Sequence, residues 1–286
     1  MKKLSPSLDD IKRQTIIALV SDDELLERLV LKGGNALRFG YQFDDRASKD
    51  LDFSMKNDFA PEEIEHFSRV INNHLKTKFR ELNLIVFDYK FEPKPKKKGV
   101  HQPDFWGGYA IEFKVLSTGY YQEQDEEHNR RHAGEKITVD ISKYEYCDWS
   151  HSVLIDDYTV YIYSLRLIVY EKLRAICQQT PEYRQIIKSQ QSRARPRDFY
   201  DIYQIMEKTR NSFQHNFEEL KLVFEAKQVP IEFLRIISRQ DQFDLHHREF
   251  ESLRQTVPNQ NVLAFKVYFD YIINLIDELS QALGIE

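Results

Sequence analysis

Residues 31–38 have the sequence LKGGNALR, and residues 46–54 have the sequence RASKDLDFS. The apolar, strand-like residues 29–31 lead into the first stretch, where Gly33 and Gly34 are followed by the start of a helix. A turn of this kind leaves backbone N–H groups at a helix N-terminus, where they can bind an anion. The glycines also let the backbone approach a bound phosphate closely. The segment therefore predicts a strand, an anion-binding turn and a helix in succession.

The second stretch contains two aspartates, Asp50 and Asp52, in a segment that alternates polar and apolar residues. This alternation is the β-strand period, so both carboxylates should lie on one face with Cα atoms about 6.6 Å apart. Two carboxylates at this spacing can share divalent cations, which prefer oxygen ligands. A bare pair of this kind is also typical of the solvent-facing side of a strand that buries Leu51 and Phe53.

Residue types that can bind phosphate precede this pair, and they favour a metal-binding role for it over the solvent-facing alternative. Arg46 and Ser48 lie shortly before Asp50, and Lys32 directly precedes the double glycine. Cationic groups, a hydroxyl and a helix N-terminus are suited to phosphate oxygens. The two stretches together predict a phosphate site beside a metal-binding carboxylate pair.

Composition narrows the class of protein. The chain has 286 residues and a formal net charge of -5, which excludes a global cationic field for nucleic acid but not a local basic surface. With 41% hydrophobic and 13% aromatic residues it should fold. We find no secretory signal and no run of about 18 apolar residues, so we expect a cytoplasmic protein that does not enter the membrane. Its two cysteines, Cys147 and Cys177, have no metal-type spacing, which excludes a Cys-based zinc site and fits a reducing compartment.

The pattern of elements predicts an α+β fold followed by a helical region. Strands are predicted at 29–31, 50–55, 84–89, 109–115 and 137–141, and helices at 8–19, 22–27, 61–82, 165–178, 198–208, 217–227 and 262–283. Ser7 is the predicted cap of the first helix. We therefore predict a small mixed sheet with flanking helices over residues 1–157 and an α-helical domain over residues 158–286.

The order of these motifs resembles a known family. Residues 31–38 followed by 46–54 closely resemble the signature of the AbiEii/AbiGii-type nucleotidyltransferases, within the DNA polymerase β-like superfamily. The sequence EKLRAI at 171–176 is similar to the family's Lys-centred motif, and RPRDFYDIY at 195–203 to its Arg-x-x-Asp-x-x-Asp motif. The superfamily's usual Gly-Ser pair is Gly-Gly here, with Ser48 available instead. The resemblance covers about residues 29–205 and implies a polymerase β-like domain followed by helices that close a nucleotide cleft.

The resemblance also implies a role for each matching residue. Carboxylates that would hold Mg²⁺, or Mn²⁺ in its place, are Asp50, Asp52 and, as a third ligand, Asp140. Groups that would bind the nucleotide are Lys32, Gly33, Gly34, Arg46, Ser48 and Lys172. Asp50, Asp52, Lys172 and Asp198 would form the catalytic set, with Lys172 neutralising triphosphate charge and Asp198 orienting Lys172 or acting near the nucleophile.

Each assignment has a structural alternative. Lys172 could be an ordinary exposed helix residue, and Asp198 and Asp201 could be first-turn acids stabilised by the helix dipole. Asp140 could be an unexceptional aspartate at a sheet edge. The histidines, including His246 and His247, have no spacing typical of a metal site.

The function implied is transfer of a nucleoside monophosphate from an NTP to a hydroxyl, with release of pyrophosphate. The acceptor expected from the family is RNA, such as the 3′ end of tRNA, and the role is that of a toxin in a toxin–antitoxin or phage-defence system with a cognate antitoxin. Basic residues that could contact triphosphate or an RNA backbone are Arg184, Lys188, Arg193, Arg195 and Arg197, whereas the lysines at 94–98 are typical of a solvated loop. The alternatives are a nucleotidyltransferase that modifies a protein or small molecule, and a catalytically idle binding module. The sequence leaves the oligomeric state open.

Overall fold

The computed structural model describes residues 6–43, 50–96, 103–123, 134–210, 212–257 and 262–285. Contacts between Cα atoms divide the chain into two compact units. Unit 1 comprises Met1–Gln42, Ser48–Lys98 and Gly107–Ile162, and unit 2 comprises Phe43–Ala47, Gly99–Trp106 and Tyr163–Glu286.

Unit 1 is built on a seven-stranded sheet, in the part of the chain that the structure describes, with the order β3-β4-β5-β2-β1-β7-β6. The strands are β1 Val30–Lys32, β2 Leu51–Ser54, β3 Leu84–Lys94, β4 Gly108–Ser117, β5 Glu135–Ser142, β6 Ser150–Ile155 and β7 Tyr158–Tyr163. β1 runs antiparallel to β2 but parallel to β7, and β2 runs parallel to β5. The sheet is therefore mixed, which together with the helices confirms the predicted α+β class.

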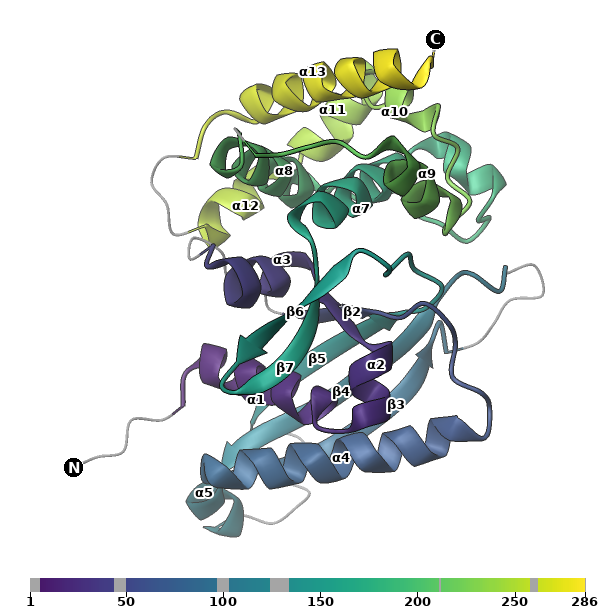
Figure 1. Ribbon diagram of the computed structural model, residues 1–286. Helices are drawn as coiled ribbons and strands as arrows, with labels where there is room; N and C mark the ends of the chain where they lie inside the picture. Colours follow the sequence, from purple (N-terminus) through teal and green to yellow (C-terminus); the bar gives the residue numbers. More distant parts are fainter. Residues whose placement is uncertain are drawn as a thin grey trace. The chain divides into compact units, whose positions relative to one another are not determined.

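Helices of unit 1 pack on this sheet because their apolar residues recur at helical spacing. α4, Glu63–Glu81, buries Phe67, Ile71, Leu75 and Phe79 along one stripe and contacts both β3 and α1, Leu8–Val20 (Figure 1). Ser7 caps α1 through a reciprocal contact with Asp10, as predicted. The shorter helices are α2 Asp23–Arg28, α3 Gly33–Asn35, a π-helical turn at Ala36–Gly40, and α5 Thr118–Glu123.

From Leu165 onward, the described residues of unit 2 form helices joined by turns and loops, and no strand. Its elements are α7 Leu165–Cys177, a 3₁₀ turn Pro181–Gln185, α8 Pro196–Lys208, α9 Phe217–Glu225, α10 Phe233–Ile236, α11 Gln240–His247, α12 Phe250–Thr256 and α13 Phe265–Leu283. α7 contacts α8 and α9, and α8 also contacts α13. Phe199 of α8 stacks on Phe269 of α13, with ring centroids 5.8 Å apart, at the centre of an aromatic core.

The hairpin formed by β6 and β7 was absent from the sequence prediction. The two residues between the strands, Asp156 and Asp157, both have positive φ, 46° and 67°. This is the backbone of a tight primed turn, which sequences usually signal with Asn-Gly or Asp-Gly, and an Asp-Asp pair carries no such signal. Tyr158, where we predicted the second domain to begin, is the first residue of β7, and unit 1 extends to Ile162.

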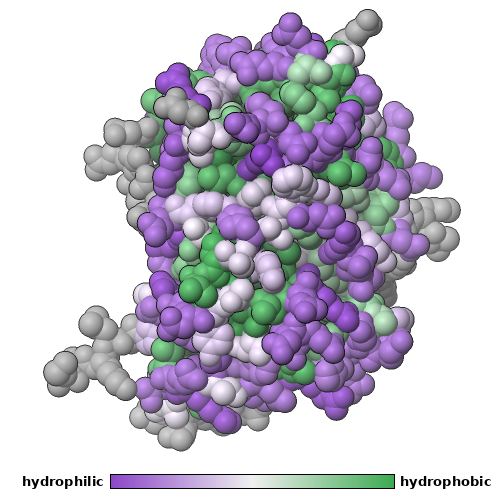
Figure 2. Space-filling model, in the orientation of Figure 1, coloured by the Kyte–Doolittle hydropathy of each residue, from purple (hydrophilic) through white to green (hydrophobic). Residues whose placement is uncertain are grey.

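The surface of the molecule is predominantly polar on the face drawn in Figure 2, with smaller apolar areas. Large apolar side chains beside and on the β6–β7 hairpin are exposed, including Leu154 at 72% and Trp149 at 47%. Among the described residues, none of the helices has the length and apolar character needed to cross a membrane. Both cysteines are buried.

Candidate functional site

In the turn after β1, the backbone of Gly33 lies close to the carboxylate of Asp52. Gly33 follows β1 directly and has a φ of +67°, which favours glycine. A Cβ atom at Gly33 would lie 3.2 Å from Oδ2 of Asp52. Lys32 and Asp52 are register partners across β1 and β2, so the turn begins beside Asp52. Both the backbone conformation and the closeness of the carboxylate therefore favour glycine at this position.

The segment carrying Asp50 is attached to the same turn. The Nδ2 of Asn35, a fully buried residue of α3, donates a hydrogen bond of 2.6 Å to the backbone oxygen of Asp50. Asp50 itself is exposed just before β2, and Asp52 is half-buried. Leu51 and Phe53 are fully buried, as the alternating pattern predicts. The predicted carboxylate pair is thus fixed to the glycine turn through Asn35, which sequence analysis did not single out.

Asp140 is the neighbour of Asp52 on the adjacent parallel strand. The two residues are register partners between β2 and β5, so their side chains emerge on the same face of the sheet. In this structure Nζ of Lys94 donates to both carboxylate oxygens of Asp140, at 2.7 and 2.8 Å. Within the described ranges, no group of three or more His, Cys, Asp or Glu side chains is arranged to hold a metal ion. The metal-binding role of Asp140 stays a prediction.

Lys32 is buried and directed toward the end of β5. Its Nζ donates to Oγ of Ser142 at 3.2 Å and lies 3.6 Å from Oε1 of Glu145, a residue that is itself buried. Gly34 is buried within α3. The other predicted nucleotide-binding residues of this unit, Arg46 and Ser48, lie outside the described residues.

A second buried lysine, Lys12 of α1, lies in the electrostatic surroundings of Asp50. Lys12 is 1% exposed, and burial lowers the pKa of its ammonium, while the charges of Asp9 and Asp50 act in the opposite direction. The sequence held a signal for it that we did not use: Lys12 stands on the same helix face as Thr15, Ile16 and Leu19 and is therefore core-facing.

The oxygen ligands of Asp50 and Asp52 fit a hard divalent cation such as Mg²⁺. Carboxylates are its preferred protein ligands, and Mg²⁺ is bound through one or two of them together with substrate phosphates. The glycine turn offers unobstructed backbone next to Oδ2 of Asp52, where a side chain would intrude. The residues present thus satisfy the chemistry of a metal and phosphate site without a third protein ligand.

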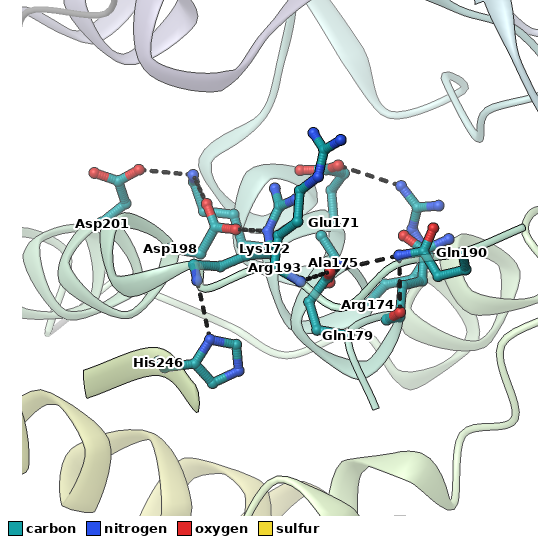
Figure 3. Close-up of polar contacts among 12 residues, drawn as sticks. Glu171, Lys172, Arg174, Ala175, Gln179, Gln190, Arg193, Asp198, Asp201 and His246 are labelled. Atoms are coloured by element: carbon teal, nitrogen blue, oxygen red, sulfur yellow. Dashed lines mark hydrogen bonds and ion pairs between the residues drawn. The ribbon is translucent and has the colours of Figure 1, made fainter. Parts of the chain in front are cut away.

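In unit 2, Lys172 lies at the centre of a buried ionic cluster (Figure 3). Its Nζ is 2.8 Å from Oδ1 of Asp198 and 2.6 Å from Oδ2 of Asp201. Lys172 is 4% exposed, Asp198 6% and Asp201 1%. The interpretation of Lys172 as an ordinary exposed helix residue is therefore wrong. Asp201, which we left out of the predicted site, is as close to Lys172 as Asp198 is.

Arg195 completes the cluster. Its Nε donates to Oδ2 of Asp198, and its backbone N–H donates to Nδ1 of His246 at 3.0 Å. Burial alone would raise the pKa of Asp198, but the charges and hydrogen bonds of Arg195 and Lys172 outweigh it and lower the pKa well below its usual range. Asp198 is therefore ionised at any physiological pH.

The basic segment before α8 is held to the end of α7 by glutamine side chains. Oε1 of Gln179 accepts a hydrogen bond from the backbone N–H of Arg193 at 3.0 Å, and Nε2 of Gln190 donates to the backbone oxygen of Gln178 at 3.2 Å (Figure 3). Exposed cations of this segment are Arg184, Lys188 and Arg193. Of the other basic run, Lys94 pairs with Asp140 and Lys96 with Glu92, while residues 97 and 98 lie outside the described ranges.

Comparison with known proteins places these features in a family. The family model described as "Nucleotidyl transferase AbiEii toxin, Type IV TA system" matches residues 16–270. A search of curated protein sequences finds no match. A Helicobacter pylori structure described as a candidate nucleotidyltransferase is similar in fold, with 17% identity, a TM-score of 0.52 and 99% coverage of both chains. JHP933 from Helicobacter pylori has 18% identity and a TM-score of 0.49, with 99% of this chain and 98% of that chain covered. The family match confirms the resemblance inferred from the sequence motifs.

Proposed function

Because the chain belongs to the AbiEii nucleotidyltransferase toxin family, we propose that it transfers a nucleoside monophosphate from an NTP to a hydroxyl group of RNA, in a Mg²⁺-dependent reaction that releases pyrophosphate. Nucleotidyl transfer is the activity of the family, and the prediction of an enzyme is confirmed at that level. The metal, the acceptor and the biological role are parts of the proposal.

One observation supports the metal and phosphate part of the proposal. Gly33 is in the left-handed conformation, and because it has no side chain, its backbone lies next to Oδ2 of Asp52. Asp50 and Asp52 would hold Mg²⁺, and the turn that begins at Gly33 would present N–H groups to phosphate oxygens. When bound, Mg²⁺ neutralises phosphate charge and polarises the phosphorus–oxygen bond under attack. Asn35 contributes by fixing the backbone of Asp50, so that the carboxylate pair keeps its spacing.

Lys172 is proposed to neutralise charge on the triphosphate, as the resemblance implies. The cluster of Lys172, Arg195, Asp198 and Asp201 contains two cations and two carboxylates. Its carboxylates hold the ammonium of Lys172 in one position through ion pairs of 2.8 Å to Asp198 and 2.6 Å to Asp201. A preorganised cation of this kind stabilises charge that grows on a leaving pyrophosphate without reorganisation during the step.

RNA is the acceptor that we favour, with the tRNA 3′ end as the specific candidate. The support is the run of exposed cations Arg184, Lys188 and Arg193, which precedes the Asp198 motif directly. Because the whole chain has a net charge of -5, binding of a polyanion would depend on such a limited basic segment. We propose further that the enzyme acts in the cytoplasm as the toxin of a toxin–antitoxin system used in phage defence. A cognate antitoxin is the partner suggested by the family description.

Incubation of the protein with Mg²⁺, each labelled NTP in turn and total tRNA tests the proposal. We expect label on tRNA, lost with Asp50→Ala and retained with Asp148→Ala. Asp148 is a matched control because it is an exposed carboxylate of the same unit, paired only with the exposed Lys56 among the contacts described. Label on protein in place of RNA would move the acceptor to the alternative class. Equal labelling by wild type and Asp50→Ala would contradict the metal role.

Toxicity is tested separately by inducible expression. We expect growth arrest with the wild-type chain and relief with Asp52→Asn. Unchanged growth at high expression would remove the toxin role and leave the transferase proposal standing.

A further inference from the structure

One buried histidine of unit 2 has no part in the roles described above. His246 of α11 is 0% exposed, and its Nδ1 accepts the backbone N–H of Arg195 at 3.0 Å (Figure 3). Its ring also packs against Phe199 of α8, with centroids 5.0 Å apart. His246 therefore contacts both the residue that precedes α8 and the first turn of that helix.

Arg195 connects His246 to Lys172. The guanidinium of Arg195 donates to Oδ2 of Asp198, while Oδ1 of the same carboxylate accepts from Nζ of Lys172 at 2.8 Å. The backbone N–H of Asp198 donates to the backbone oxygen of Arg195 at 3.0 Å, which closes the turn between them. The imidazole of His246 is thus linked to the ammonium of Lys172 by a hydrogen bond to the Arg195 backbone, by the Arg195 side chain, and by two hydrogen bonds to Asp198.

The protonation of His246 follows from its contacts. Because Nδ1 accepts a hydrogen bond, the proton of the neutral ring resides on Nε2. Nε2 is buried and has no hydrogen-bond partner among the described residues. Leaving a polar N–H unpaired in the interior is unfavourable, so a purely space-filling role would be served better by an apolar side chain. An apolar side chain could not accept the hydrogen bond that Nδ1 accepts from the backbone N–H of Arg195.

The charged groups that face the ring are Asp198 and Arg195. Burial lowers the pKa of His246 to about 4, with Asp198 acting in the opposite direction and Arg195 in the same one. The ring is therefore neutral, and Nδ1 stays available as an acceptor, at neutral pH.

We propose that His246 is a positioning residue for nucleotide binding: by fixing the backbone of Arg195 it holds the guanidinium on Asp198 and, through Asp198, sets the position of the Lys172 ammonium. The final step, contact of Lys172 with a triphosphate, rests on the proposed function. The effect of His246 on Lys172 itself does not.

Two substitutions separate the acceptor role from packing. His246→Asn keeps an acceptor close to the position of Nδ1, and His246→Leu removes it while retaining apolar volume. His247→Leu is the matched control, because His247 is the next residue of α11 and is exposed.

The first readout is the rate at which an amine-reactive acetylating ester modifies Lys172 in the full chain, measured by peptide mass spectrometry. We expect modification about tenfold faster in His246→Leu, the equivalent of one lost buried hydrogen bond, and wild-type rates in the other two variants.

The second readout is the transfer reaction. We expect His246→Leu to raise the KM for NTP about tenfold with a smaller change in kcat, and His246→Asn to restore the wild-type KM. Wild-type Lys172 reactivity in His246→Leu would overturn the inference. Absence of transfer by the wild-type chain would overturn the proposed function instead, and the acetylation rates would still decide the role of His246.

A measurement on the wild-type chain covers the case in which His246→Leu does not fold. ¹⁵N NMR of histidine-labelled protein at neutral pH should show His246 with an unprotonated Nδ1 and a protonated Nε2. If His246, assigned by comparison with His246→Asn, is instead an imidazolium or carries its proton on Nδ1, the inference is wrong.

Discussion

Two lysine–aspartate pairs in this protein have nearly the same nitrogen–oxygen distance and different surroundings. Nζ of Lys94 lies 2.7 Å from Oδ1 of Asp140 in unit 1, and Nζ of Lys172 lies 2.8 Å from Oδ1 of Asp198 in unit 2. The side chains of the first pair are 59% and 30% exposed, and those of the second are 5% and 8% exposed. The two distances differ by only 0.1 Å, so the difference in burial decides how much each pair contributes to stability.

Burial also decides what each pair can do. An exposed ion pair is screened by water and contributes little, so Asp140 can exchange Lys94 for another cation at small cost. A buried lysine cannot leave its carboxylates without exposing uncompensated charge to the protein interior. Under the proposed function, Asp140 would be an exchangeable metal ligand beside Asp52, and Lys172 would be a fixed cation for the triphosphate.

The largest expected effect is on the buried pair. Lys172→Met removes the ammonium that lies between the buried carboxylates of Asp198 and Asp201, and should lower the free energy of unfolding by about 3–5 kcal/mol. Urea unfolding followed by circular dichroism measures this. Adding Asp201→Asn to Lys172→Met should recover part of the loss, because one uncompensated charge is removed. A loss below about 1 kcal/mol, the range of exposed pairs, would show that burial does not separate the two pairs.

The pH dependence of stability gives the next effect, and it reports on the neighbourhood of the buried pair. Burial lowers the pKa of His246 to about 4 in the folded chain, whereas an unfolded histidine titrates at about 6.5. Between these values the unfolded chain binds the proton more readily, so this contribution to stability is complete above pH 6.5 and is lost as the pH falls toward 4. The free energy of unfolding should fall by up to about 1.4 kcal/mol per pH unit from this group.

The control for this prediction is His246→Asn, which cannot titrate. Urea unfolding at pH 7, 6, 5 and 4 should give a steeper decline for the wild-type chain than for the variant. Parallel declines would show that His246 is protonated in the folded chain at the same pH as in the unfolded one.

Two glycines with the same φ of +67°, Gly33 and Gly284, test whether the turn beside Asp52 belongs to the site in unit 1, the unit that contains the exposed pair. Alanine at either Gly33 or Gly284 should cost about 1 kcal/mol of stability from backbone strain. Only at Gly33 would the new Cβ crowd a carboxylate, 3.2 Å from Oδ2 of Asp52, whereas nothing lies within 4 Å at Gly284. We therefore expect Gly33→Ala to reduce nucleotidyl transfer at least tenfold beyond any effect of Gly284→Ala, measured at equal fraction folded. Equal activity of the two variants would remove Gly33 from the site.

The smallest expected effect is on the exposed pair. Lys94→Met should change the free energy of unfolding by less than about 1 kcal/mol. If Asp140 is a metal ligand, releasing it from Lys94 should also lower the Mg²⁺ concentration that gives half-maximal transfer, and Asp140→Asn should raise it. Identical Mg²⁺ dependence in wild type, Lys94→Met and Asp140→Asn would exclude Asp140 from the metal site.

Local patterns were sufficient to predict the parts of this molecule that depend on neighbouring residues. The alternation around Asp50 and Asp52 predicted β2, and the double glycine predicted the turn after β1, because side-chain period and backbone freedom are properties of a short segment. The α+β class and the family followed from the order of these motifs, and the family match confirms that inference.

Features that depend on distant residues were missed. The hydrogen bond from the backbone N–H of Arg195 to His246 joins residues 51 positions apart. The hydrogen bond from Lys32 to Ser142 joins residues 110 positions apart. A histidine or lysine on an apolar helix face carries no indication of which distant donor or acceptor it will meet. The β6–β7 hairpin was missed for a different reason, because Asp156 and Asp157 adopt positive φ without the glycine that usually announces it.

The most direct test of the central claim follows the two ends of the NTP triphosphate. Parallel reactions with NTP labelled at the α- or the γ-phosphorus, Mg²⁺ and total tRNA would be run with the wild-type chain and Asp52→Asn. The account predicts that wild type transfers the α-label to the acceptor and releases the γ-label as pyrophosphate, and that Asp52→Asn does neither. Transfer of the γ-label to the acceptor, or equal α-labelling by Asp52→Asn, would contradict it.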